Sequence, residues 1–102
     1  MITKEFRYHI TVDDWIDVRF TIDDDSNIVK FSDNYTALID QKAYPIIRYD
    51  NAHDCAHIDR YWTSKKEQIQ GKTNLEIIRL ARNDIINNWK KHRKKVEQLL
   101  GI

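Results

Sequence analysis

The stretch that decides the fold runs from Arg48 to Trp62 and reads RYDNAHDCAHIDRYW. The residues before it alternate between apolar and polar as antiparallel strands do, and the residues after it have the spacing of one long helix. Within this stretch lie two histidines, three aspartates, two arginines and two tyrosines. We therefore expect the stretch to join the sheet to the helix and to hold the functional site.

Upstream of this stretch, the chain alternates with a period of two. Apolar residues recur at every second position over 6–12 and again over 16–22, around a break at Asp13-Asp14, which predicts a hairpin. A third strand is predicted over 28–31, with a possible extension over 35–39 beyond a bend at Asp33-Asn34. Pro45 cannot donate to a ladder, so we place it at the start or on the edge of a fourth strand, 46–49. Residues 56–62 form a possible fifth strand.

Downstream, residues 63–72 are polar and are interpreted as a linker. Thr73 and Glu76 fit a capping box, and Gly101 is a suitable stop. Between them the sequence predicts one helix with an apolar stripe that includes Ile78, Ala81, Ile85, Trp89 and Val96. The chain is thus predicted to be a single α+β domain over 1–102, with an antiparallel sheet of four to five strands in 1–62 and a long helix over 73–100.

Composition places the chain among small globular proteins. It has 102 residues, 41% of them apolar, and a formal net charge of +1. One Cys, no apolar run of membrane-spanning length and no signal-like start predict a cytoplasmic protein without a membrane contact. The charge is uneven, since residues 1–64 have 7 Lys and Arg against 12 Asp and Glu, whereas residues 65–102 have 10 against 4.

The central stretch contains the groups needed for acid–base cleavage of RNA. Two histidines, His53 and His57, could divide proton removal and donation, with Tyr61 as an auxiliary donor. A cation steadies the charge that develops on the phosphate during such a reaction. The residues predicted to bind the substrate are Arg48, Tyr49, Asp50 and Arg60.

Other interpretations of this stretch stay open. A divalent metal at His53, His57 and Asp59 is possible but not favoured, because a His-x3-His pair across a turn need not converge; no cofactor is therefore expected. The charged residues could equally form surface ion pairs around a turn, which stabilise a fold by about 0–1 kcal/mol each. Cys55 is interpreted as a small buried side chain and not as a nucleophile.

The helix has a basic section near its end. Lys90, Lys91, Arg93, Lys94 and Lys95 are candidates for phosphate contacts with nucleic acid. They could also be a solvated helix end that matches the helix dipole, or a docking surface for an acidic partner. This section of the helix could further pack on a second copy as a homodimer.

Part of the central stretch resembles a known family. At RYDNAH (48–53), followed by His57 and by Asp59-Arg60-Tyr61, the chain resembles the TumE-type toxins of toxin–antitoxin systems and their uncharacterised archaeal relatives. The resemblance covers about fourteen residues, and Asp59 stands where a second histidine of the arm is expected. It implies a growth-inhibiting protein that acts on RNA and is restrained by a cognate antitoxin. The residues it points to are Tyr49, Asp50, His53, His57 and Arg60.

Two function classes follow from the sequence. The first is a small toxin-like protein that cleaves RNA with His53 and His57 as proton carriers and without a metal. The second is a non-enzymatic module that binds a protein or a nucleic acid and dimerises through its C-terminal helix.

Overall fold

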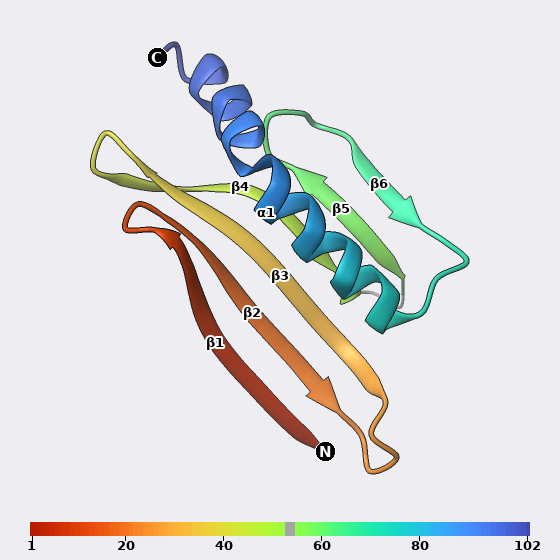
Figure 1. Cartoon of the computed structure of the whole chain (residues 1–102). Helices are drawn as coiled ribbons and strands as arrows, with labels where there is room; N and C mark the ends of the chain where they lie inside the picture. The colour runs from red at the N-terminus through yellow and green to blue at the C-terminus, as the bar shows by residue number, and fades with distance from the viewer. Residues whose placement is uncertain (53–54) are drawn as a thin grey trace.

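The computed structural model describes residues 1–52 and 55–102. In this part of the chain, strands β1 to β6 form one antiparallel sheet in chain order, and the single helix α1 crosses one face of it (Figure 1). The α+β fold is confirmed, with six strands in place of the expected four to five. The elements are β1 (Ile2–Thr11), β2 (Asp14–Ile22), β3 (Ile28–Ile39), β4 (Lys42–Asp50), β5 (Ala56–Arg60), β6 (Lys66–Ile69) and α1 (Asn74–Leu99).

Two strands differ from the prediction. β3 runs unbroken through Asp33 and Asn34, where a bend was expected, because both residues pair in register with β2 and β4. β6 lies within 63–72, which was expected to be a linker, and it pairs with β5 as a short edge strand. Its residues are mostly exposed, so they lack the apolar alternation that identifies a half-buried strand.

Pro45 lies inside β4 and not at its start, but β5 pairs with β4 only over 47–50, so Pro45 is at a local edge of the described sheet, as expected. It sits opposite Thr36 where the register of β3 and β4 shifts, so the irregularity accommodates the missing N–H.

The turn between β3 and β4 has Asp40 and Gln41 as its central residues, whose φ angles are +50° and +67°. Positive φ at both central residues is what a tight primed turn requires.

The helix begins as the sequence predicts. The Thr73 hydroxyl accepts a hydrogen bond of 3.1 Å from the Glu76 amide, and the Glu76 carboxylate accepts one of 3.1 Å from the Thr73 amide. This capping box satisfies two backbone donors at the start of α1. The helix then extends over 26 residues, and its predicted stripe is buried at Ile78, Ala81, Ile85 and Val96.

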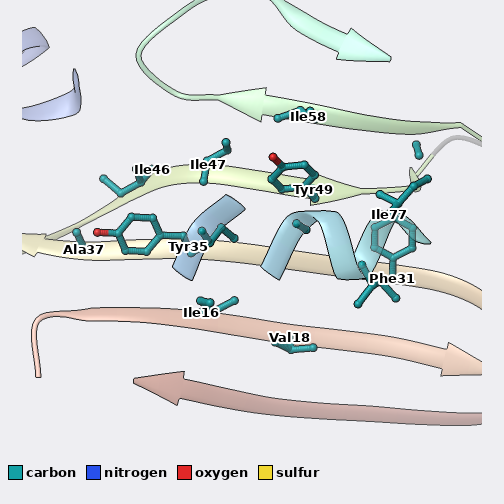
Figure 2. Packing of buried hydrophobic residues seen from close by; sticks show 14 of the residues in the cluster. Ile16, Val18, Phe31, Tyr35, Ala37, Ile46, Ile47, Tyr49, Ile58 and Ile77 are labelled. Carbon is teal, nitrogen blue, oxygen red and sulfur yellow. The ribbon is translucent and has the colours of Figure 1, made fainter. Parts of the chain in front are cut away.

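The core is one layer between α1 and the sheet. Buried apolar side chains from β2 to β5 group with Ile77 of the helix (Figure 2). The helix lies over β3 and β4, so β1 at the far edge is not covered by it (Figure 1). No helix in the described ranges is long and apolar enough to cross a membrane.

Candidate functional site

The face of the sheet that α1 does not cover, here called the open face, presents the charged residues of the central stretch. Tyr49 points toward α1, since its hydroxyl donates a hydrogen bond of 2.6 Å to Asp84 of the helix. Side chains alternate along a strand, so the neighbours Arg48 and Asp50 point to the open face.

Cross-strand pairing brings the rest of the cluster to the same place. His57 of β5 stands opposite Asp50 of β4, and Asp59 stands opposite Arg48. Residues directly opposite each other in an antiparallel pair share a face and have neighbouring side chains. These four residues are called the ion cluster below.

The imidazole of His57 is held between oxygen atoms. Its Nε2 lies 3.0 Å from Asp50 Oδ1 and 3.8 Å from Asp59 Oδ2, and its Nδ1 lies 3.3 Å from the Cys55 carbonyl oxygen. The Nδ1 contact is a hydrogen bond with the Cys55 carbonyl, whereas the Nε2 contact with Asp50 is a close contact that is not directed as a hydrogen bond.

Arg48 joins the two carboxylates. Its outer nitrogen donates a hydrogen bond of 3.1 Å to Asp59, and its Nε lies 2.8 Å from Asp50 Oδ2. The second contact is ionic, because the Nε hydrogen is not directed at the carboxylate. Burial lowers the pKa of Arg48, but the hydrogen bond to Asp59 and the charge of Asp50 outweigh it and raise that pKa, so the guanidinium stays charged.

The cluster is buried although it lies on the open face. Asp50, His57 and Asp59 are each at most 8% exposed, and only Arg48 reaches solvent substantially. Unpaired charges at such a depth would cost several kcal/mol each, so the residues stabilise one another as a set. Lys66 adds a further positive charge 3.7 Å from Asp59.

A hollow of about 740 Å³ opens beside the cluster. Arg48 and Asp50 form part of its wall, while His57 lies behind Asp50. The lining is mixed, since the cations of Arg19, Lys30 and Arg48 lie beside the carboxylate of Asp50 and beside apolar side chains such as Phe20 and Phe31. Arg19 and Arg48 are already paired with carboxylates, so Lys30 is the lining cation with no ion pair among the described residues.

The same residues offer donors for a metal ion. One ligand atom each from Asp50, His57 and Asp59 lies within 4.8 Å of the others. Two carboxylates and an imidazole are a donor set that divalent cations accept. The third predicted metal ligand, His53, lies outside the described residues.

The predicted site residues divide between the two faces of the sheet. Arg60 stands opposite Ile47, so it is on the helix side with Tyr49, and it pairs with Glu67 at 3.3 Å. Tyr61 follows β5, is 37% exposed, and lies beside Arg48 in a smaller hollow. The catalytic candidate His53 is outside the described residues. Of the predicted set, the structure brings together Arg48, Asp50 and His57 in the ion cluster, and Arg60 and Tyr61 line the smaller hollow beside Arg48.

The basic section of α1 is similarly divided. Lys90, Lys91, Lys94 and Lys95 are exposed. Arg93 instead donates hydrogen bonds of 2.9 and 3.1 Å to the buried carboxylate of Asp14, so its charge is used within the fold.

Sequence reasoning did not find the other walls of the hollow. Arg19 and Ser32 stand opposite each other in β2 and β3, and Ser32 stands opposite Asp50. Their place in the site depends on the register of three strands. The available signal was the alternation that puts Arg19 on the polar face of its strand, but it did not indicate which residues would become neighbours.

No curated protein and no solved structure matches the chain. A family model does match, over residues 1–101, and its description is domain of unknown function, DUF7718. The likeness to TumE-type toxins stays a prediction from the central stretch. Since the match spans nearly all of the sequence, the chain belongs to the DUF7718 family.

Proposed function

We propose that this protein cleaves RNA by acid–base chemistry at the ion cluster, as the toxin of a toxin–antitoxin pair. The observation that carries the proposal is the contact chain from Arg48 through Asp50 to His57 beside a hollow that Arg48 and Asp50 help to line. A cation, a carboxylate and an imidazole in mutual contact can together bind a phosphate and transfer a proton.

In the proposed reaction, a base removes the proton of the 2′-hydroxyl, and the 2′-oxygen attacks the phosphorus. The bond to the 5′-oxygen breaks, and an acid protonates that oxygen as it leaves. The products are a 2′,3′-cyclic phosphate and a 5′-hydroxyl. Arg48 is assigned to the phosphate charge, with Arg19 and Lys30 supplying additional positive charge along the wall.

The proton donor is assigned to the pair of Asp50 and His57. His57 Nε2 lies 3.0 Å from Asp50 Oδ1, and Asp50 lines the hollow. In the proposed acid step, a protonated His57 ring passes its proton to Asp50, and Asp50 passes a proton to the leaving 5′-oxygen. The pair thereby loses one positive charge and ends as a neutral imidazole beside a carboxylate, and a proton from solvent restores it for the next turnover. His53 keeps its predicted role as the base, on the evidence of the sequence alone.

The toxin assignment depends on the resemblance of residues 48–61 to TumE-type proteins. It predicts growth inhibition on expression, relieved by a cognate antitoxin. The exposed lysines of α1 are assigned to the RNA backbone, outside the site of cleavage.

A second candidate is metal-dependent hydrolysis at the same cluster. The observation that favours it is the convergence of donor atoms from Asp50, His57 and Asp59 within 4.8 Å. Such a metal would be held by these three residues and would supply an activated water molecule. Arg48 beside the carboxylates opposes it, because a guanidinium already neutralises part of their charge.

The test is cleavage of an end-labelled single-stranded RNA by purified protein, with and without EDTA, followed by analysis of the product ends. Cyclic phosphate ends formed equally in EDTA support the proposal. Loss of cleavage in EDTA and its return with a divalent cation support the metal candidate. Absence of cleavage with each of several RNAs, together with no growth inhibition on expression, would reject both and leave the binding module.

A further inference from the structure

β1 is an edge strand of the sheet. It is a ten-residue strand that pairs on one side with β2, and no described strand pairs with its other side. Residues 2–9 are exposed, and the strand contains no Pro. Long edges are templates for pairing with another chain, and charged residues and bulges are among the features that keep an edge free. β1 has both, since it contains Lys4, Glu5 and Arg7 and its register with β2 shifts between His9 and Thr11. A partner must therefore match these charges.

The helix side of β1 is also apolar and exposed. Phe6 is 46% exposed and Tyr8 is 51% exposed, and Ile86 of α1 beside them is 47% exposed. These three residues line a groove of about 150 Å³ with Ile16, Val18 and Arg82. The Arg82 guanidinium lies 5.6 Å above the Phe6 ring. The groove lies over β2, with α1 on one side and the Phe6 and Tyr8 side chains of β1 on the other.

We propose that a second copy of this chain pairs with β1, antiparallel and two-fold symmetric, with Phe6 opposite Phe6. The inference is independent of the proposed function. A two-fold axis between antiparallel strands is perpendicular to the sheet, so one residue of each strand faces its own copy. The two helices then lie on the same side of one continuous sheet.

The charges of β1 select this register. Centred on Phe6, the pairing puts Glu5 of each copy opposite Arg7 of the other, twice in the interface. Centred on Lys4, Glu5 or Arg7, it would put identical charges directly opposite each other, which is destabilising in an antiparallel pair. Self-complementary charge around an apolar centre is the pattern that an isologous interface requires.

Charges on β2 extend the complementarity. Arg7 lies 2.8 Å from Asp17, and Glu5 lies 3.1 Å from Arg19, all on the open face. Across the proposed interface between the two β1 strands, the charged residues follow in the order Asp17, Arg7, then Glu5 and Arg19 of the second copy. Their charges alternate between negative and positive. Exposed pairs contribute little energy individually, so their role is to fix the register, while the apolar groove supplies the burial.

The test uses two opposite charge reversals. In Glu5→Arg, the positive charge at position 5 faces Arg7 of the second copy. In Arg7→Glu, the negative charge at position 7 faces Glu5 of the second copy. Because like charges then face each other, each variant should dimerise about tenfold more weakly or worse. Mixed together, the two variants restore opposite charges at both positions and should form a heterodimer. The measurement is mass by light scattering and sedimentation, with circular dichroism as the check on folding and Lys42→Glu, on the far β4 turn, as the matched control.

Disulfide cross-linking measures the register directly and does not require either charge-reversal variant to fold. In a Cys55→Ser background, Phe6→Cys should form a disulfide-linked dimer on mild oxidation, because position 6 faces itself. Tyr8→Cys should not, since position 8 faces position 4. A wild-type monomer at tens of micromolar, dimerisation unaffected by both reversals, or equal cross-linking at positions 6 and 8 would overturn the inference.

Discussion

The hydroxyl of Tyr49 donates a hydrogen bond of 2.6 Å to Asp84 and so ties the centre of the sheet to the helix. Asp84 also accepts a hydrogen bond of 3.1 Å from Asn88 and lies 3.0 Å from His92 Nε2. Burial raises the pKa of Asp84. The contacts with His92, Tyr49 and Asn88 together lower it by more than burial raises it, so the pKa lies below its usual value. Tyr49, a predicted substrate ligand, therefore serves the contact between β4 and α1 in the free protein.

Replacing Tyr49 with Phe should lower the free energy of unfolding by about 1–3 kcal/mol, because a hydrogen bond to a charged partner is removed inside the fold. RNA cleavage should be retained, since the hydroxyl points away from the open face. Urea unfolding measures the first effect. Tyr44→Phe is the control, because that hydroxyl has no hydrogen-bond partner among the described residues; equal destabilisation of the two variants would contradict the assignment.

Arg93 and Lys94 are neighbours in the basic section but should differ in their effect on stability. Arg93→Gln leaves the buried carboxylate of Asp14 without its cation, which should cost about 2–4 kcal/mol. Lys94→Gln removes an exposed charge and should change stability by less than about 0.5 kcal/mol. Thermal and urea unfolding of the two variants give the comparison, and similar stabilities would refute the role of Arg93 in the fold.

Asp33 should make stability depend on pH in an unusual direction. Burial raises its pKa to about 6, although Arg82 at 3.5 Å lowers it. The folded state thus holds this proton more tightly than the unfolded chain, so the contribution of Asp33 is favourable at low pH and is lost as pH rises from about 4 to about 6. At most about 3 kcal/mol is involved.

The measurement for Asp33 is the difference in unfolding free energy between wild type and Asp33→Asn at several pH values. This difference isolates one carboxyl from the others. The unfolding free energy of the Asn variant should rise relative to that of wild type as pH increases from about 4 to about 6. A difference that is constant with pH would exclude the raised pKa of Asp33.

The exposed lysines of α1 should contribute to RNA affinity and not to the chemistry. Replacing Lys90, Lys91, Lys94 and Lys95 with Gln should weaken binding and flatten its salt dependence, by roughly 0.7 in logarithmic slope for each phosphate that the protein no longer neutralises. Fluorescence anisotropy at several salt concentrations measures both quantities. An unchanged slope would mean that this surface does not bind RNA.

The sequence predicted the parts of the fold that depend on local patterns. The alternation over 6–12 and 16–22, the Thr73 capping box and the helical stripe all correspond to observed elements. β6 was not predicted because its residues are mostly polar and exposed, so they lack the apolar alternation of a half-buried strand. Asp33 and Asn34 suggested a bend because such residues favour turns, but cross-strand pairing on both sides keeps them extended.

The site was predicted less completely because it depends on register. Arg48 and Arg60 were expected to act together, but Arg60 stands opposite Ile47, which places it on the other face of the sheet. The composition of the central stretch pointed to the segment that contains the four residues of the ion cluster, two in β4 and two in β5. Which of its residues share a face was decided by the pairing of β4 with β5, and this pairing joins residues that are seven to thirteen positions apart in the sequence.

The most direct test of the proposed chemistry is the single-turnover rate of RNA cleavage by His57→Gln against wild type, with Arg60→Gln as the control. Gln keeps a donor for Asp50 but has no proton to exchange, so the rate should fall by about a hundredfold or more while the fold is retained. Arg60→Gln, on the opposite face, should cleave at the wild-type rate. If His57→Gln cleaves as fast as wild type, the ion cluster is not the catalytic site.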